Sequence, residues 1–400
     1  MKRDTTPPSL KRRRILGLAL ASVSAFGLGL GPALAAGDLT IGLILPLSGV
    51  YADQGVYYED GARLYQKTHS TDVAGRTVRL VVRDDQGPGS GDLARRLTQE
   101  LILREKAEVI IGYSFTPNAM AAAGLLTDAK TPGIIVNAMT SVLTEKSPYI
   151  TRISATMAQV TYTLGQWAAE NGIGSVYTIA TDYAPGIDAE TWFIKGFTGA
   201  GGKVLGSDRT PITAMEYGPF LQRAIEAHPE AVFAFNPGGD VSIAFMKQAA
   251  DRLEGTGIQL LVTGDVVDEN LLPAMGRAAE GVISAWHYQT DVDTPANAEF
   301  IAAFKAEYGA DKLPSYRVMQ GYDAMALVYQ ALAATGGKTG DAFVAAIKGM
   351  ELASPRGPVM IDPETRDIVE NIYIRKGEVI DGVTVNKSFA TVEAVKDPAK

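Results

Sequence analysis

The first strand of the fold reads Leu39-Thr40-Ile41-Gly42-Leu43-Ile44-Leu45. A run this short and this apolar is typical of a strand that is covered on both faces of a parallel sheet. Amphipathic segments alternate with similar runs over the next hundred residues. The further strands predicted are Val78–Val82, Val109–Ile111 and Gly133–Val136, and the helices between them are Val56–Lys67, Asp92–Lys106 and Asn118–Thr127.

The same alternation then begins again. Strands are predicted at Val176–Ala180, Lys203–Leu205, Val232–Phe235, Leu260–Val262 and Val282–Ala285, with helices near 157–171, 186–199, 218–227, 241–253 and 269–276. Two blocks of alternating strands and helices predict an α/β protein with two Rossmann-like lobes built on parallel sheets. After about residue 354 the pattern changes to antiparallel strands at Pro358–Ile361, Val369–Arg375 and Glu378–Val385, with turns at residues 362–364 and 376–377.

The start of the chain has the pattern of a cleavable export signal. Four basic residues, Lys11 to Arg14, precede an apolar run from Ile15 to Leu30, and Ala33-Leu34-Ala35 follows. The run contains three glycines and is too short for a spanning helix. We therefore expect export to the periplasm and cleavage near Ala35, with residues 1–35 as the signal; either the Sec or the twin-arginine route fits.

Composition excludes several classes of function. The chain has no cysteine and three histidines, so disulfides, thiolate metal sites and a histidine-rich metal site are not expected. Its formal charge is −8, and the predicted signal contributes six bases and one acid, which leaves about −13 on the mature chain. That acidity, without a basic cluster after Arg14, argues against nucleic acid as a partner and against binding or insertion at an anionic membrane.

Three partial matches to catalytic or nucleotide-binding motifs each lack a required glycine. Residues 112–116 read Gly-Tyr-Ser-Phe-Thr, with Thr116 where a nucleophile elbow needs its second glycine. A phosphate loop before Gly337-Lys338-Thr339 would need glycine at position 332, which is Leu332. Asp92 stands where a dinucleotide fingerprint needs glycine. We expect no enzymatic activity, no cofactor and no metal.

Polar loops follow the predicted strands at their carboxyl ends, where open α/β sheets bind ligands. These loops supply the candidate ligand-binding residues Ser48, Tyr51, Ser114, Phe115, Ala138, Thr140, Tyr183, Asn236 and Asp265. A serine or threonine after a strand is also an ordinary helix cap, and Thr116 is such a candidate, with Pro117 at the first helical position. Their shared position in both blocks favours a small molecule held between two lobes.

An ordered set of short segments resembles one family. The segments are residues 41–49 with Gly61-Ala62, 82–85, 110–112, 182–186 and 321–324, and together they cover essentially residues 38–385. They resemble the type I periplasmic binding proteins of the leucine/isoleucine/valine-binding class, which are solute receptors of ABC importers. The resemblance implies a three-crossing hinge near residues 154, 286 and 354. It implies an N-terminal lobe of 36–154 plus 286–353 and a C-terminal lobe of 155–285 plus 354–400.

The resemblance also implies roles for single residues. The loops with Ser48, Ser114, Phe115 and Thr140 would meet a ligand carboxylate, Tyr183 would cover the ligand, and Asp265 would bind an ammonium group. Phe115 and Trp286, the latter at the second crossing, suit a flat apolar ligand with an anionic end. Residues 354–358 and 361–367 are similar to a subgroup that binds aromatic carboxylates.

The leading hypothesis is therefore a monomeric periplasmic receptor that captures an aromatic acid and delivers it to a membrane permease. A branched-chain amino acid or amide is the alternative ligand of the same fold. A ligand sensor for a signalling receptor is the alternative of another class.

Overall fold

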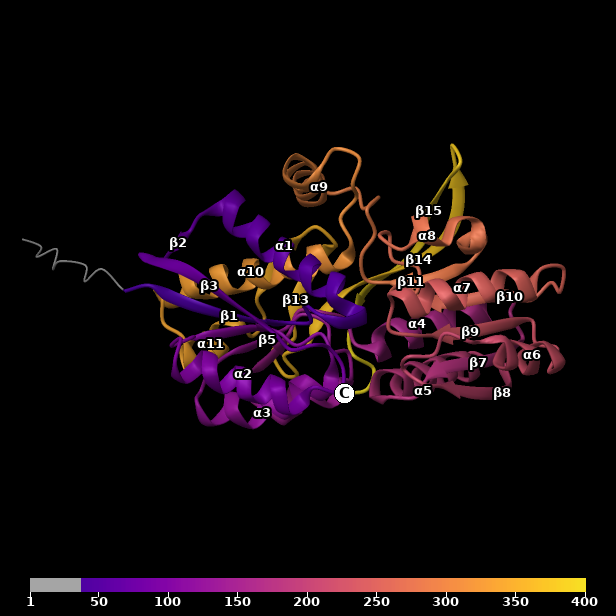
Figure 1. Ribbon diagram of the computed structural model, residues 1–400, viewed down its shortest axis with the longest axis horizontal. Helices are drawn as coiled ribbons and strands as arrows, with labels where there is room; N and C mark the ends of the chain where they lie inside the picture. The colour runs from indigo at the N-terminus through magenta and orange to yellow at the C-terminus, as the bar shows by residue number, and fades with distance from the viewer. Residues whose placement is uncertain (1–36) are drawn as a thin grey trace, which may run out of the picture. The chain divides into compact units, whose positions relative to one another are not determined.

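Two mainly parallel β-sheets organise the protein, whose computed structural model describes residues 37–400 (Figure 1). The export signal predicted at residues 1–35 and its cleavage site lie outside the described residues. The first sheet has six strands in the order β2-β3-β1-β4-β5-β6. The second has nine, in the order β12-β13-β14-β11-β10-β9-β7-β8, with β15 paired to β14. The predicted α/β fold with two parallel-dominated lobes is confirmed.

The six-stranded sheet follows the first block of the sequence. Its strands are β1 (Leu39–Leu45), β2 (Asp72–Val73), β3 (Arg76–Asp84), β4 (Val109–Gly112), β5 (Gly133–Ile135) and β6 (Ile150–Arg152). The helices between them are α1 (Ala52–His69), α2 (Gly91–Leu103) and α3 (Thr116–Asp128), with 3₁₀ turns at Gly49–Tyr51 and Ser141–Lys146. Every residue of β1 is buried and its two neighbours run parallel to it, as its continuous apolar sequence requires.

The nine-stranded sheet follows the second block and the end of the chain. Its strands are β7 (Ser175–Thr181), β8 (Lys203–Thr210), β9 (Ala231–Phe235), β10 (Gln259–Thr263), β11 (Ile283–Trp286), β12 (Glu351–Ser354), β13 (Gly357–Ile361), β14 (Ile368–Ile380) and β15 (Val383–Val395). Its helices are α4 (Met157–Glu170), α5 (Ala184–Gly199), α6 (Gly218–Glu226), α7 (Asp240–Leu253) and α8 (Leu272–Met275). The parallel part, β7 to β11, lies between helices, and β12 to β15 add antiparallel strands.

Three helices connect β11 to β12: α9 (Pro295–Tyr308), α10 (Tyr316–Thr335) and α11 (Gly340–Ile347). Helix α10 packs on α1 so closely that a Cβ atom at Gly61 would lie 1.9 Å from the Val318 carbonyl oxygen. At Gly321 it would lie 2.1 Å from the Tyr58 carbonyl oxygen. The glycines at these positions therefore allow the two backbones to touch, which joins α10 to the half that holds the six-stranded sheet.

The C-terminal hairpin differs from the prediction. The turn expected at Lys376-Gly377 is wrong, because both residues lie inside β14, where Lys376 pairs with Lys387. The chain turns instead at residues 381–382 and returns as β15, so the strand predicted at Glu378–Val385 spans the turn. A Cβ atom at Gly377 would lie 1.8 Å from the Ala279 carbonyl oxygen. Glycine is therefore required at position 377 by a close backbone contact. In the sequence alone, such a glycine looks the same as a glycine that marks a turn.

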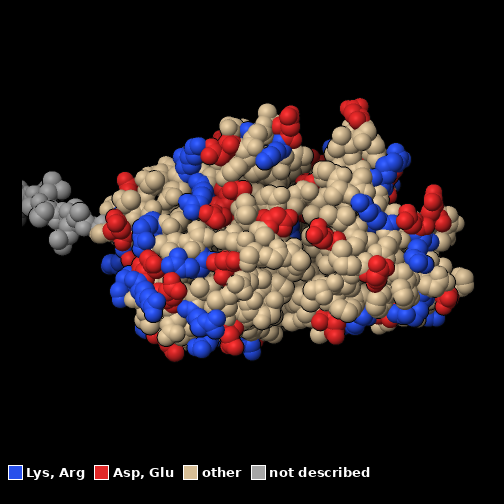
Figure 2. Space-filling view, in the orientation of Figure 1, with Lys and Arg blue, Asp and Glu red and all other residues tan. Residues whose placement is uncertain are grey.

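Charged side chains of both signs lie on the face of the protein that Figure 2 draws. In Figure 2, basic and acidic side chains are intermixed at the end of the half that holds the six-stranded sheet, and the middle of this face is mainly uncharged. Among residues 37–400, no helix is both long enough and apolar enough to cross a membrane. Within the same residues, no group of three acidic or histidine side chains is placed to hold a metal ion.

Candidate functional site

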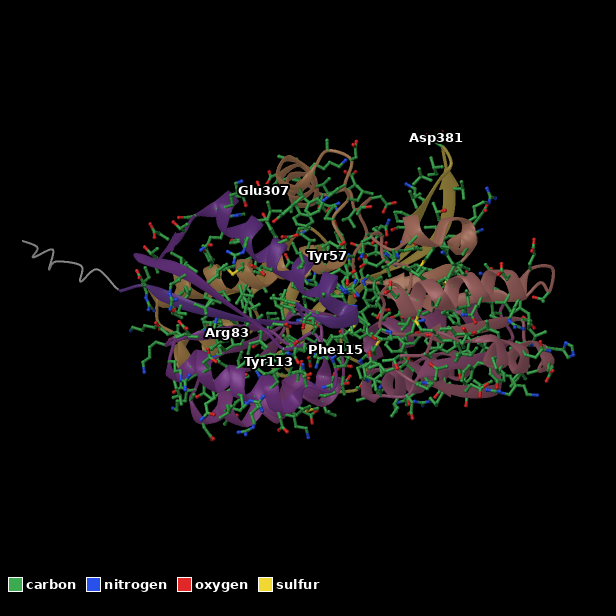
Figure 3. All side chains as sticks on the ribbon, in the orientation of Figure 1. Tyr57, Arg83, Tyr113, Phe115, Glu307 and Asp381 are labelled. Atoms are coloured by element: carbon green, nitrogen blue, oxygen red, sulfur yellow. The ribbon has the colours of Figure 1, made fainter. Side chains whose placement is uncertain are left out.

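A small space lies where the two halves meet at the carboxyl ends of their strands. Its cavity volume is about 10 Å³, which is room for about one water molecule. The residues around it are Ser114, Phe115, Asn137, Met139, Met157, Tyr183, Pro185, Pro237 and Asp265. Figure 3 shows Phe115 at this junction, close to the labelled Tyr113. Aromatic, methionine and proline side chains are the majority of these residues, but polar atoms make up the larger part of the surface that faces the space.

The end of β4 turns sharply into this space. Tyr113 has a φ of 61°, a left-handed conformation that bulky residues rarely adopt and that costs on the order of 1–3 kcal/mol. The surroundings hold it there, because its ring is fully buried and its hydroxyl lies 2.7 Å from the Thr98 hydroxyl. The next residue, Ser114, is 2% exposed, and its hydroxyl has no hydrogen-bond partner among the described residues. The turn thus presents an unsatisfied donor at the space.

Three helices begin beside the space. Phe115 is the residue before α3, Met157 is the first residue of α4, and Tyr183 is the residue before α5. The N-terminus of a helix carries a positive partial charge and free backbone N–H groups, which favour an anion. Thr116 was predicted as a cap, and this is wrong, because it is the first residue of α3 and its hydroxyl donates to the Thr140 hydroxyl at 3.1 Å.

Among the described residues that border the space, Asp265 is the one acidic side chain and none is basic. It is 4% exposed, and its Oδ1 accepts a hydrogen bond from the Thr263 hydroxyl at 2.6 Å. Burial raises the pKa of Asp265 to about 6, and the Thr263 hydroxyl and the nearby Arg317 guanidinium limit the increase. Burial and the Asp265 charge also raise the pKa of the Tyr183 hydroxyl, which is therefore a neutral donor at physiological pH.

Two contacts join the halves at the rim of the space. The Tyr51 hydroxyl donates to the Ile212 carbonyl at 3.3 Å, and the Gln54 amide donates to the Pro237 carbonyl at 3.2 Å. The ring of Tyr51 lies 5.1 Å from that of Phe115, and Tyr51 is only 3% exposed. Tyr51 therefore covers the space from outside rather than bordering it.

The structure places the ten predicted site residues in three groups. Ser114, Phe115, Tyr183 and Asp265 border the space. Four lie directly behind them or at the rim: Tyr51, Ala138, Thr140 and Asn236. The carbonyls of Ala138 and Thr140 accept hydrogen bonds from Arg152, and the side chain of Asn236 accepts one from Ser242. Ser48 is exposed beside Asp84. Trp286 is fully buried in the core, with its ring 4.9 Å from that of Tyr316.

Several residues at the space were not among the predicted ones. Asn137 donates to the Ser114 carbonyl at 3.2 Å, and its Oδ1 has no partner among the described residues. It directly follows a strand, which is the signal that selected its neighbours. Met157 follows Thr156, which forms a capping box with Gln159, so the Thr-x-x-Gln pattern marked this helix start. Arg317, buried beside Asp265 and paired with Asp268, had no comparable signal.

Comparisons with known proteins agree with this geometry. The chain is 38% identical over 384 residues to the Leu/Ile/Val-binding protein homolog 6 of Brucella melitensis biotype 1, covering 95% of this chain and 98% of that one. A solute-binding protein of an ABC transporter from Rhodopseudomonas palustris BisB5, solved with 3,4-dihydroxybenzoic acid, is 46% identical with a TM-score of 0.86. One from strain HaA2, solved with p-hydroxybenzoic acid, is 41% identical with a TM-score of 0.87. Both alignments cover 90% of this chain and 99% of the other.

The sequence profile of one family spans almost the whole described chain. It matches residues 38–382 and is that of a periplasmic binding protein. This match, the two lobes and the solute-binding neighbours agree with the predicted resemblance. The chain belongs to the periplasmic binding protein family and is similar over nearly its full length to the solute-binding proteins of ABC transporters.

Proposed function

We propose that this protein binds a hydroxylated aromatic carboxylate, such as 4-hydroxybenzoate, between its lobes and delivers it to the permease of an ABC importer. One observation carries the choice of ligand class: aromatic and methionine side chains border the space together with three polar residues, a combination that suits a flat ring with polar ends. The two solved neighbours above, which hold 3,4-dihydroxybenzoic and p-hydroxybenzoic acid, support the same choice.

The carboxylate of the ligand would lie at the helix starts. The Ser114 hydroxyl has no partner among the described residues, and the first turns of α3, α4 and α5 converge there. A carboxylate that accepts from a buried hydroxyl and a backbone N–H gains charge-assisted hydrogen bonds, which are stronger than neutral ones. These groups would hold an anion although none of the described residues bordering the space is basic.

The aromatic ring would lie among Phe115, Tyr183, Met139 and Met157. Tyr183 is itself stacked on Phe235, with ring centroids 6.1 Å apart, so its orientation is fixed before a ligand arrives. Methionine sulfur packs well at the edge of an aromatic ring, and the two methionines are 2% and 1% exposed. These four side chains suit a flat ring better than they suit a branched aliphatic chain.

Asp265 would accept the hydrogen of the ring hydroxyl. One of its oxygens is engaged by Thr263, which leaves the other for a ligand. A ligand without a donor at this point would bury a carboxylate without compensation, which is costly. The ammonium group of an amino acid would also satisfy Asp265, and the Brucella relative's name keeps a branched-chain amino acid as the second candidate.

The wider functional setting is inferred by analogy with the family. We infer an exported periplasmic receptor cleaved near Ala35, with lobes of 36–154 plus 286–353 and 155–285 plus 354–400. We infer further that it is monomeric, without a cofactor, and releases its ligand chemically unchanged.

A thermal-shift screen tests the ligand class. Wild-type protein is unfolded and refolded to remove carried-over ligand and then scanned with benzoates, branched-chain amino acids and their amides. A ligand at about one hundred times its Kd should add about 2.7 kcal/mol to the free energy of unfolding. Stabilisation by 4-hydroxybenzoate supports the proposal, and stabilisation by leucine alone contradicts it.

A further inference from the structure

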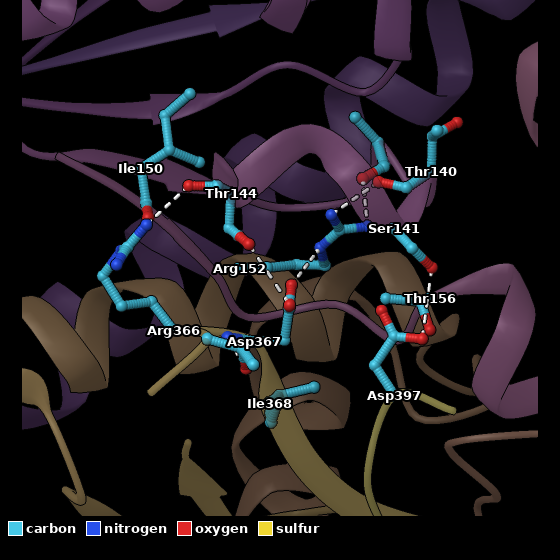
Figure 4. Close-up of polar contacts among 12 residues, drawn as sticks. Thr140, Ser141, Thr144, Ile150, Arg152, Thr156, Arg366, Asp367, Ile368 and Asp397 are labelled. Carbon is cyan, nitrogen blue, oxygen red and sulfur yellow. Dashed lines mark hydrogen bonds and ion pairs between the residues drawn. The ribbon is translucent and has the colours of Figure 1, made fainter. Parts of the chain in front are cut away.

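A buried arginine holds one loop of the candidate site from behind (Figure 4). Arg152, at the end of β6, is fully buried and donates to the Ala138 carbonyl at 2.9 Å and to the Thr140 carbonyl at 2.7 Å. Its Nε lies 2.9 Å from Oδ1 of Asp367, which is 1% exposed. The loop of residues 137–141 is therefore fixed by a side chain that does not border the ligand space.

The C-terminal segment of residues 397–400 joins the same cluster. It follows β15, which pairs with β14 of the nine-stranded sheet, and reaches the loop on the other half. The Ser141 hydroxyl donates to Asp397 at 3.1 Å, and the Lys400 ammonium donates to Oδ2 of Asp367 at 2.6 Å. Asp397 is 6% exposed, so this contact is buried. The segment thus links the two halves at the loop.

Residues of the 137–141 loop connect these contacts to the ligand space. Asn137 and Met139 border the space, and the carbonyls of the residues that follow each of them are the ones that Arg152 holds. The Thr140 hydroxyl accepts from Thr116, the first residue of α3. A shift of the segment at Ser141 would therefore move side chains at the space and the start of a helix beside it.

We propose that Asp397 and Lys400, acting through Ser141, Asp367 and Arg152, are positioning residues for ligand binding. They hold the 137–141 loop in the conformation that the bound ligand needs, without touching the ligand. Because Asp397 follows β15 of one half and Ser141 lies in the loop of the other, their contact also holds the halves together around the ligand. This inference rests on the proposed binding site, although not on the chemical identity of its ligand.

The test is an affinity measurement on the full mature chain with 4-hydroxybenzoate as the probe. The double variant Asp397→Ala/Lys400→Met removes the side chains that contact Ser141, Thr144 and Asp367. Lys396→Met is the matched control, since Lys396 lies directly before this segment and its ammonium is 2.9 Å from a carboxylate oxygen of Asp362. Among the described residues, Lys396 has no ion pair or hydrogen bond with the 137–141 loop. Lys400→Arg is the conservative variant that keeps the charge. Dissociation rates, Kd and the urea midpoint without ligand are measured for each.

We expect the double variant to raise Kd about tenfold, mainly through faster dissociation, as the loss of one or two charged hydrogen bonds implies. Lys396→Met and Lys400→Arg should stay within twofold of wild type. A double-variant Kd within twofold of wild type overturns the inference, whatever happens to the urea midpoint, and so does an equal loss in Lys396→Met. If the wild-type protein binds leucine instead, the proposed ligand is wrong, and the same comparison with leucine still decides the positioning role.

Discussion

Replacing Asp265 with alanine should separate hydroxylated from unsubstituted benzoates. The carboxylate is 4% exposed and has one oxygen not engaged by Thr263, so a ring hydroxyl would donate to a charged, desolvated acceptor. Such a hydrogen bond contributes about 1.5–3 kcal/mol. Asp265→Ala should therefore raise the Kd of 4-hydroxybenzoate by roughly 10- to 150-fold. For benzoate, which has no donor there, Kd should stay the same or fall.

The assay is calorimetric titration of both ligands into wild-type and Asp265→Ala protein, at pH 7.5 and after removal of carried-over ligand. The difference between the two ligands isolates the hydroxyl contact, because packing changes from the lost side chain affect both titrations. An equal change in Kd for the two ligands would refute the assignment of Asp265 to the ring hydroxyl. A circular-dichroism melt of the unliganded variant controls for its folding.

Three further predictions address pH, the anion contact and stability. The pKa of Asp265 is about 6, and a hydrogen bond donated by the ligand favours its charged form, so the affinity for 4-hydroxybenzoate should fall as the pH is lowered from 7.5 to 5.5. Benzoate favours the protonated form of Asp265, so its affinity should rise over the same range. Titrations across this range test both expectations. Ser114→Ala should weaken every benzoate by about 1.5–3 kcal/mol in the same titration; unchanged affinity would remove Ser114 from the carboxylate contact. Arg356 is fully buried between Asp323 at 2.8 Å and Glu370 at 2.6 Å, so Arg356→Met should lower the unfolding free energy in urea by about 3–5 kcal/mol.

The order of strands and helices in the two alternating blocks could be predicted because apolar periodicity is a local signal. Leu39–Leu45 was predicted to the residue, since Asp38 and Pro46 bound a continuous apolar run. The same signal found the strands at Pro358–Ile361 and Val369–Arg375, and only the turn of the last hairpin was misplaced. At Gly377 a glycine required by the Ala279 carbonyl has the same appearance as one required by a turn, and only the packed structure distinguishes them.

The candidate site could be predicted in part, because carboxyl ends of parallel strands always meet at one edge of a sheet. Ser114, Phe115, Tyr183 and Asp265 all follow strands or start helices, and the structure brings them together. Trp286 was chosen for its chemistry at a predicted crossing, but it packs against Gly264 and Tyr316 in the core. Arg152 had no signal, because its role depends on a carboxylate more than two hundred residues away.

The central claim is that the space between the lobes takes an aromatic acid. The most direct measurement is a calorimetric titration of refolded wild-type protein, first with 4-hydroxybenzoate and then, in a separate sample, with leucine. The structure predicts saturable binding of one 4-hydroxybenzoate per chain and no saturable heat with leucine. Saturable binding of leucine, with none for 4-hydroxybenzoate or benzoate, would contradict the claim and return Asp265 to the recognition of an ammonium group.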